Sequence, residues 1–272
     1  MTLSEKFNRL KENLNQIGSV VIAYSGGVDS SMLLKTASLS GLKKILAVTA
    51  SSESFPRNEL SLVQGITSAL NVEHRIIFTE ELKDPNYANN PPDRCYYCKK
   101  ELFSKLKGIA AKENFSFVID GTNADDIHDW RPGRRAAAEA GIQSPLLDAG
   151  LKKEEIRDIS RSLGLLTWNK PAAPCLSSRF PYGQKITAES LDRVNRAEDF
   201  IKRFGFTELR VRDYSETARI EVLPEEFPIL LDKSTRTEII NSLKKLGYKY
   251  ITLDLQGFRS GSLNERITDD LR

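Results

Sequence analysis

The stretch Ala23-Tyr24-Ser25-Gly26-Gly27-Val28-Asp29-Ser30-Ser31 joins a predicted strand to a predicted helix. The β-branched run at residues 20–22 precedes it, and residues 31–35 continue it with a helical pattern. Its two glycines allow the backbone to turn tightly and to approach a ligand closely. The first N–H groups of the following helix have no partner within the helix, and they face the ligand with the positive end of the helix dipole behind them. A strand that ends in such a turn predicts an anion-binding site.

Three side chains of this turn add to the predicted anion site. Asp29 stands where a carboxylate caps the helix or holds a divalent cation, and Ser25 and Ser30 supply hydroxyl donors. The turn is not a Walker A loop, because no Gly-Lys-Ser/Thr follows at the required spacing. An isolated Ser-Gly-Gly would predict only a capped glycine turn. The complete Ser-Gly-Gly-Val-Asp-Ser, placed after the first strand, favours nucleotide binding instead.

Strands and helices alternate through the first part of the chain, which predicts an α/β fold with a parallel, doubly wound sheet covered by helices on both faces. Ligands bind such sheets at the carboxyl ends of the strands. Residues 121–126, which begin with Gly121 and Thr122, follow the fourth predicted strand, so we expect them to converge with the turn at residues 25–30. The predicted strands are residues 20–22, 45–49, 74–78 and 115–120, and the predicted helices include residues 3–17, 57–70 and a helix that ends near residue 114.

A second, smaller α+β domain is predicted toward the carboxyl end. A long loop with three prolines, residues 168–181, precedes a predicted helix at residues 187–204. Loops of this length in compact domains are usually functional, and the apolar content of this one argues against disorder. We place the domains at residues 1–185 and 186–272. The second domain has predicted strands at residues 208–212, 218–222 and 248–253 and a predicted helix at residues 234–246.

Composition indicates a globular protein of the cytoplasm. The chain has 272 residues, a formal net charge of +3 and three cysteines. This charge is too small to predict nucleic-acid binding by itself. No apolar run approaches the length of a membrane span, and the amino-terminal residues lack the apolar core of a signal peptide. An odd number of cysteines does not make a disulfide framework, so we expect thiols or metal ligands in a reducing compartment.

The cysteines allow three interpretations. Cys95 and Cys98 form a Cys-x-x-Cys pair, and Cys175 lies far away in the sequence. They are incidental thiols, or ligands of a zinc site, or ligands of an iron–sulfur cluster. Structural zinc takes four ligands, and His74 and His128 are the only histidines in the chain. Three thiolates would leave one iron of a 4Fe-4S cluster open to bind a further group such as a hydrosulfide, because four thiolates are the usual number.

Three stretches together resemble a known family. The Ser-Gly-Gly-Val-Asp-Ser stretch is similar to the pyrophosphate loop (PP-loop) of the HUP-like ATP pyrophosphatases. That likeness implies cleavage of ATP between its α and β phosphates and adenylylation of a substrate. With Pro-Cys-Leu-Ser-Ser-Arg at residues 174–179 and Leu-Asp-Leu-Gln-Gly-Phe-Arg-Ser-Gly-Ser-Leu-Asn-Glu at residues 253–265, the chain resembles the LarE family over nearly its whole length.

The LarE resemblance implies an ATP-dependent sulfur insertase. It would act in the biosynthesis of the nickel-pincer nucleotide, which is the cofactor of lactate racemase. Its substrate is pyridinium-3,5-dicarboxylic acid mononucleotide, whose carboxylates are adenylylated with Mg²⁺ and then converted to thiocarboxylates. In one branch the sulfur comes from the cysteine that corresponds to Cys175. That branch lacks the Cys-x-x-Cys pair, so this chain resembles the branch in which Cys95, Cys98 and Cys175 hold a 4Fe-4S cluster. The immediate sulfur source, Cys175 or a cluster-bound sulfide, and the protein that supplies the sulfide stay open.

The resemblance also implies roles for particular residues and an assembly. The arginines suit the phosphate and carboxylates of the substrate, because a guanidinium pairs with both in a bidentate way. A hexamer built as a trimer of dimers is implied as well. The resemblance implies that Gly121 and Thr122 border the adenosine. The implied pyrophosphate-binding residues are Ser25, Gly26, Gly27, Asp29 and Ser30. The implied substrate-binding residues are Ser178, Arg179, Glu198, Arg210, Arg212, Glu221 and Arg259.

Three other functions were weighed. A tRNA thiolation enzyme shares the loop and a three-cysteine cluster, but such enzymes usually carry a broad basic surface or an added RNA-binding module, and a net charge of +3 argues against one. An adenine-nucleotide sensor would leave ATP intact. An amide-forming ligase would leave the cysteines unexplained. Pyrophosphate release that depends on the pyridinium nucleotide separates the sulfur insertase from the sensor.

Overall fold

The computed structural model describes residues 1–56, 59–127, 131–171, 174–259 and 261–263. The chain divides into two compact units. The first unit consists of Met1–Glu81 with Asp93–Ala173, and the second consists of Leu82–Pro92 with Pro174–Arg272. Among the described residues, no helix combines the length and the apolar character that crossing a membrane requires.

The first unit contains a four-stranded sheet in which all strands are parallel. The strand order is β3-β2-β1-β4, so β1, which leads into the Ser-Gly-Gly turn, lies in the interior of the sheet. A single parallel bridge between Ile119 and Gln143 extends the pairing beyond β4. The predicted parallel α/β fold is confirmed. Its strands are β1 (Ser19–Ala23), β2 (Lys44–Ser51), β3 (Glu73–Phe78) and β4 (Phe117–Ile119).

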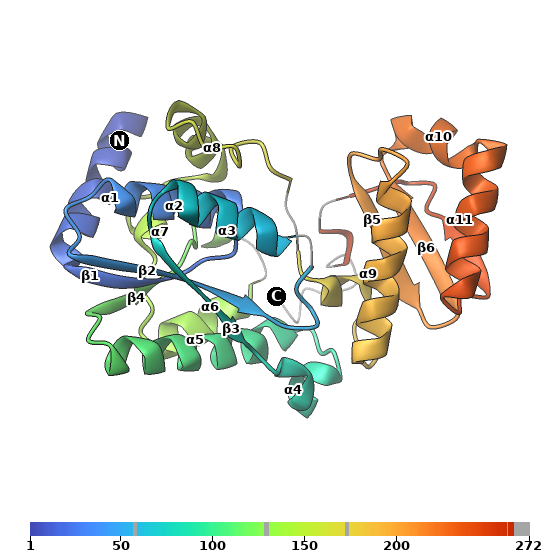
Figure 1. Cartoon of the computed structure of the whole chain (residues 1–272), viewed down its shortest axis with the longest axis horizontal. Helices are drawn as coiled ribbons and strands as arrows, with labels where there is room; N and C mark the ends of the chain where they lie inside the picture. Colours follow the sequence, from blue (N-terminus) through green and yellow to red (C-terminus); the bar gives the residue numbers. More distant parts are fainter. Residues whose placement is uncertain (57–58, 128–130, 172–173, 260, 264–272) are drawn as a thin grey trace. The chain divides into compact units, whose positions relative to one another are not determined.

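Helices cover both faces of this sheet (Figure 1). Alternating residues of β1 point to opposite sides, because Val20 and Ile22 enter one buried cluster while Val21 enters another. The first cluster includes residues of α1 (Leu3–Ile17), α2 (Val28–Ser38), α3 (Glu59–Ala69), α7 (Pro145–Asp148) and α8 (Lys153–Ser162). The second includes residues of α5 (Arg94–Lys112) and α6 (Gly133–Glu139).

The second unit is a small three-stranded mixed sheet with helices. Strands β5 (Leu209–Tyr214) and β6 (Thr217–Val222) pair antiparallel, and β7 (Tyr250–Leu253) pairs parallel to β6. Residues Val211 and Ile220 pack into its core with apolar residues of the helices. This confirms the predicted smaller α+β unit. Its helices are α4 (Pro85–Ala88), α9 (Ala188–Lys202), α10 (Phe227–Leu231) and α11 (Lys233–Lys245).

The boundary between the units differs from the one we expected. The units divide between residues 173 and 174, and residues 82–92 join the second unit, whereas we placed the division after residue 185. Backbone bonds account for this, because Gly183 N donates to Asn90 O at 2.9 Å and Ile186 N donates to Ala88 O at 2.8 Å. The segment around α4 and the loop that follows residue 174 therefore pack as one piece.

Candidate functional site

The turn between β1 and α2 has the conformation that its glycines predict. Gly26 has a φ of 72°, in the left-handed region that favours glycine, and a Cβ there would overlap Cγ1 of Val63. Gly27 caps α2 in an extended conformation with a φ of −76°, and the helix begins at Val28. The turn thus presents the first N–H groups of α2 at the carboxyl end of β1, as an anion site requires.

The two serines of the turn, Ser25 and Ser30, are hydrogen-bonded to each other. Their hydroxyl oxygens lie 3.1 Å apart, and the backbone N–H of Ser25 donates to Ser30 Oγ at 3.3 Å. The Ser30 hydroxyl in turn donates to the carbonyl of Gly27 at 3.3 Å. Ser30 is buried while Ser25 is exposed. Ser30 therefore fixes the shape of the turn, and Ser25 faces the side that a ligand can reach.

Asp29, in the first turn of α2, is held by two donors from distant parts of the first unit. Asn123 Nδ2 donates to Asp29 Oδ1 at 3.2 Å, and Lys153 Nζ pairs with Asp29 Oδ2 at 2.5 Å. Asn123 follows β4 and Lys153 begins α8. The carboxylate that we expected to hold a divalent cation is thus paired with an ammonium group at the same edge of the sheet.

Gly121 packs directly against the beginning of α2. A Cβ at Gly121 would lie 3.0 Å from the backbone nitrogen of Ser30 and 3.3 Å from its Cα. The ends of β1 and β4 therefore meet, as the parallel sheet predicts. Thr122 turns instead to Asp120, to which its hydroxyl donates at 2.8 Å, and its role beside adenosine stays a prediction.

A second lysine reaches the turn from the long loop. Lys170 Nζ donates to the carbonyl of Gly26 at 3.0 Å and pairs with the Glu59 carboxylate. Arg157 of α8 holds this loop, because it donates to the carbonyls of Trp168 at 2.7 Å and Lys170 at 3.0 Å. Lys153 and Lys170 together bring two ammonium groups to the turn, which favours binding of a polyphosphate.

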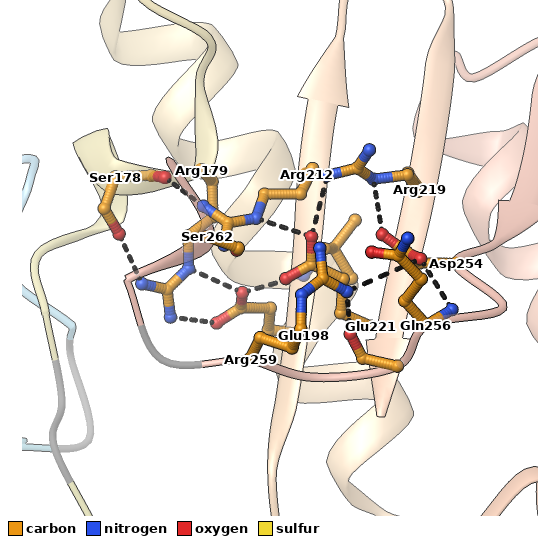
Figure 2. Close-up of polar contacts among 12 residues, drawn as sticks. Ser178, Arg179, Glu198, Arg212, Arg219, Glu221, Asp254, Gln256, Arg259 and Ser262 are labelled. Carbon is orange, nitrogen blue, oxygen red and sulfur yellow. Dashed lines mark hydrogen bonds and ion pairs between the residues drawn. The ribbon is translucent and has the colours of Figure 1, made fainter. Parts of the chain in front are cut away.

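In the second unit, six of the residues that we expected to meet the substrate lie close together beside β5 and β6. Figure 2 shows Ser178, Arg179, Glu198, Arg212, Glu221 and Arg259. Arg179 makes a bidentate pair with Glu198, with Nε–Oε1 at 2.8 Å and Nη2–Oε2 at 3.0 Å. Both side chains are buried, with 7% and 3% of their surface exposed. Arg179 also donates to Ser178 Oγ at 2.9 Å and to the carbonyl of Pro174 at 3.0 Å, which fixes the loop around Cys175.

Arg212 links three parts of this group. Its Nε donates to Glu221 Oε1 at 2.9 Å, its Nη1 to the carbonyl of Ser178 at 2.6 Å, and its Nη2 to the Ser262 hydroxyl at 2.8 Å. Arg219 donates to the same Glu221 oxygen at 2.9 Å, while Glu221 Oε2 is buried without a hydrogen-bond partner in the described chain. Arg259 lies beside Asp254, with 4.0 Å between Nη1 and Oδ1.

Arg210 differs from its neighbours because it has no carboxylate partner among the residues that the structure describes. It is 6% exposed, and its guanidinium carbon lies 4.5 Å from the centre of the Phe258 ring. Burial, together with the charges of Arg212 and Arg179, lowers the pKa of Arg210 to about 10. The charges of Glu221 and Glu198 act on Arg210 in the opposite sense, but no carboxylate of the described residues is ion-paired with it. A buried guanidinium without a paired carboxylate is suited to an anionic ligand.

The comparison with known proteins now decides the family. A pyridinium-3,5-bisthiocarboxylic acid mononucleotide synthase of Lactiplantibacillus plantarum is 38% identical over 98% of this chain and 96% of its own length. This chain belongs to the LarE family. Uncharacterized proteins of Synechocystis and Methanocaldococcus jannaschii are 42% and 33% identical, over 98% and 96% of this chain and 99% and 100% of their own lengths. No protein-family model matches the chain.

The cysteines of this LarE chain are divided between the two units. Cys95 and Cys98 lie in the first turn of α5, in the first unit, and Cys175 directly precedes the short helical turn Leu176–Arg179 of the second. A Cys-x-x-Cys in one helical turn puts both thiols on the same side of the helix, which suits two ligands of one cluster. Within the described part of either unit, no three His, Cys, Asp or Glu side chains are placed to hold a metal. A three-cysteine site would therefore need both units.

Two lysines at the turn between β1 and α2 were missing from our sequence-based prediction. Asn123, in contrast, lies in the stretch after β4, residues 121–126, that we expected to converge with this turn. Lys153 and Lys170 gave no such signal, because each lies more than a hundred residues from the atoms that it meets at the turn. His128, which we weighed as a zinc ligand, lies outside the described residues.

Proposed function

We propose that this chain is an ATP-dependent sulfur transferase that converts the carboxylates of pyridinium-3,5-dicarboxylic acid mononucleotide to thiocarboxylates, in the biosynthesis of the nickel-pincer nucleotide. The observation that carries the proposal is full-length similarity, at 38% identity, to a pyridinium-3,5-bisthiocarboxylic acid mononucleotide synthase. The two groups of polar residues support it, because one suits a polyphosphate and the other suits an anionic substrate.

Activation of the carboxylate is the first chemical task. A carboxylate is a poor electrophile, and transfer of AMP to it creates a good leaving group and releases pyrophosphate. The N–H groups at the start of α2, together with Lys153 and Lys170, would stabilise charge on the leaving pyrophosphate. Asp29 would hold Mg²⁺, which supplies further neutralisation of the phosphates when it is bound. Lys153 would then leave Asp29 and become available to a phosphate oxygen.

The arginines of the second unit would divide two tasks between them. Arg179 and Arg212 already pair with Glu198 and Glu221, so those two arginines chiefly keep the cysteine loop in shape. Arg210 has no such carboxylate among the described side chains and would take the phosphate or a carboxylate of the pyridinium nucleotide. Arg259, at the rim, would meet a second anionic group.

Sulfur transfer replaces the AMP leaving group. A sulfur nucleophile attacks the acyl carbon, the C–S bond forms, the C–O bond to phosphate breaks, and AMP departs. Cys95, Cys98 and Cys175 would hold a 4Fe-4S cluster, which when bound would supply sulfide for this step. Without the cluster, the Cys175 thiolate itself would be the nucleophile and would form a thioester. Loss of the Cα proton of Cys175 to a base, with breaking of its Cβ–S bond, would then leave dehydroalanine on the chain and release the thiocarboxylate.

Two measurements on purified protein test the proposal. Pyrophosphate release from Mg-ATP should require the pyridinium nucleotide. An equal rate of release with and without this nucleotide would contradict its role as the substrate. Mass spectrometry of the chain before and after turnover then separates the sulfur sources. Several products per unchanged polypeptide indicate sulfide delivery by the cluster, and loss of one sulfur from the Cys175 peptide indicates the sacrificial route. Intact ATP under all conditions would indicate a nucleotide sensor, and a salt-sensitive complex with tRNA would indicate tRNA thiolation.

A further inference from the structure

The segment after β7, described at residues 254–259 and 261–263, is bonded to the end of β6 through Asp254 and Phe258. Asp254 N donates to the carbonyl of Ile220 at 2.9 Å, and Phe258 N donates to the carbonyl of Val222 at 2.8 Å. Gly257 between them has a φ of 72°. A Cβ at Gly257 would lie 2.9 Å from both the Val222 oxygen and the ring of Pro224. Only glycine fits this approach, and the approach determines where Phe258 stands.

The Arg210 guanidinium carbon lies over the ring of Phe258. The guanidinium carbon lies 4.5 Å from the ring centre, which is within the range of a cation–π contact. No hydrogen-bond acceptor contacts the Arg210 side chain in the described part of the chain, so this ring is what orients it. A guanidinium that stacks on a ring keeps its N–H donors in the plane, directed away from the ring and able to bind an anion in a bidentate way.

The same segment also reaches the neighbouring arginine. The Ser262 hydroxyl accepts from Arg212 Nη2 at 2.8 Å, while Arg259 lies beside Asp254 of the same segment (Figure 2). Arg212 has Glu221 as well, so it keeps a carboxylate partner without the segment. Among the described residues, Arg210 has no ion-paired carboxylate and lies over the ring of Phe258, so its orientation depends more on this segment than that of Arg212 does.

We propose that Phe258 is a positioning residue of the substrate site. Its ring fixes the orientation of the Arg210 guanidinium so that the N–H donors of Arg210 meet the phosphate of the pyridinium nucleotide. This inference rests on the proposed function for the identity of the ligand. It concerns the second unit alone, so ATP binding at the turn between β1 and α2 does not depend on it.

Binding measurements on the full-length protein test the inference. The probe is nicotinic acid mononucleotide, a pyridinium carboxylate with one phosphate, and its Kd is measured by calorimetry for the wild type and four variants. We expect Phe258→Leu, which keeps apolar volume but loses the ring, to weaken binding about tenfold. Phe258→Trp should stay within about threefold of the wild type, because it restores the ring face. Arg210→Met should lose binding, and Leu255→Ala, in the same segment but 82% exposed, should change nothing.

The outcomes separate this inference from the proposed function. Equal affinity of wild type and Phe258→Leu, with loss in Arg210→Met, would overturn the positioning role and leave the function standing. If the nucleotide does not bind at all, inorganic phosphate is used as the probe. Phosphate binding that still depends on both Arg210 and Phe258 would support the positioning role and count against the pyridinium substrate. Unchanged affinity for a non-hydrolysable ATP analogue in Phe258→Leu shows that the variant is folded, and an equal loss there would overturn the inference.

Discussion

Gly121 illustrates how a single atom sets the distance between a strand end and a helix. Gly121→Ala places a Cβ 3.0 Å from the Ser30 nitrogen, so the first turn of α2 has to move. We expect the affinity for Mg-ATP to fall about tenfold or more, because the N–H groups that face the phosphates are displaced. Calorimetry with a non-hydrolysable ATP analogue measures this. Gly108→Ala, in open space within α5, is the matched control and should stabilise the chain by about 0.5–1 kcal/mol without a change in affinity. Equal affinity in both variants would contradict the close contact.

His74 should make the stability of the first unit depend on pH. Burial lowers the pKa of His74 below its usual 6.5, and its Nε2 lies 2.9 Å from the Thr49 hydroxyl. The unfolded chain therefore binds a proton more readily than the folded one, so stability falls as the pH drops below about 6.5. Urea unfolding between about pH 7 and about pH 5 should show a smaller loss in His74→Gln than in the wild type. An identical pH dependence in the two proteins would exclude this role for His74.

At the scale of elements, α9 is joined to the cysteine loop by one buried ion pair. Removing one charge from a buried, bidentate pair leaves the other without compensation, which costs about 3–5 kcal/mol. We expect Glu198→Ala to lose stability of that order, because Arg179 would remain buried. Asp192→Ala is the control on the same helix, where an exposed pair with Arg196 should contribute less than about 1 kcal/mol. Urea unfolding measures the free energy of unfolding of both variants. Similar losses in the two would contradict the larger contribution of the buried pair to stability.

For the whole molecule, iron binding tests whether the two units act together. Neither unit supplies three cysteines, so a cluster held by Cys95, Cys98 and Cys175 requires both. After anaerobic reconstitution, the wild type should hold iron and acid-labile sulfide, and replacement of any one cysteine by serine should remove most of both. Leu255→Ala, whose side chain is 82% exposed, is the control and should keep the cluster. A wild type that takes up no iron would exclude the cluster.

Much of the fold could be predicted because it depends on local periodicity. The β-branched run of Val20, Val21 and Ile22 predicted the strand before the turn, and the apolar spacing from Leu3 to Ile17 predicted the first helix with the observed bounds. Short elements were missed. We predicted no helix at residues 85–88, yet Asp84 caps one there by accepting from Asn86 N at 2.9 Å. One turn of helix leaves too little pattern in a sequence to be recognised.

The alternation of strands and helices along the chain and the family could be recognised from the sequence alone, and the sequence also predicts that the turn binds phosphate. These follow from neighbours along the chain, since glycine conformations, side-chain alternation and helix capping act over a few residues. Only the tertiary structure decided that Lys153, 124 residues away, pairs with Asp29, and that residues 82–92 belong with the second unit. It also decided that Arg210 has a ring as its neighbour where Arg212 has a carboxylate. Such partners depend on how strands pair and units pack, which no local pattern specifies.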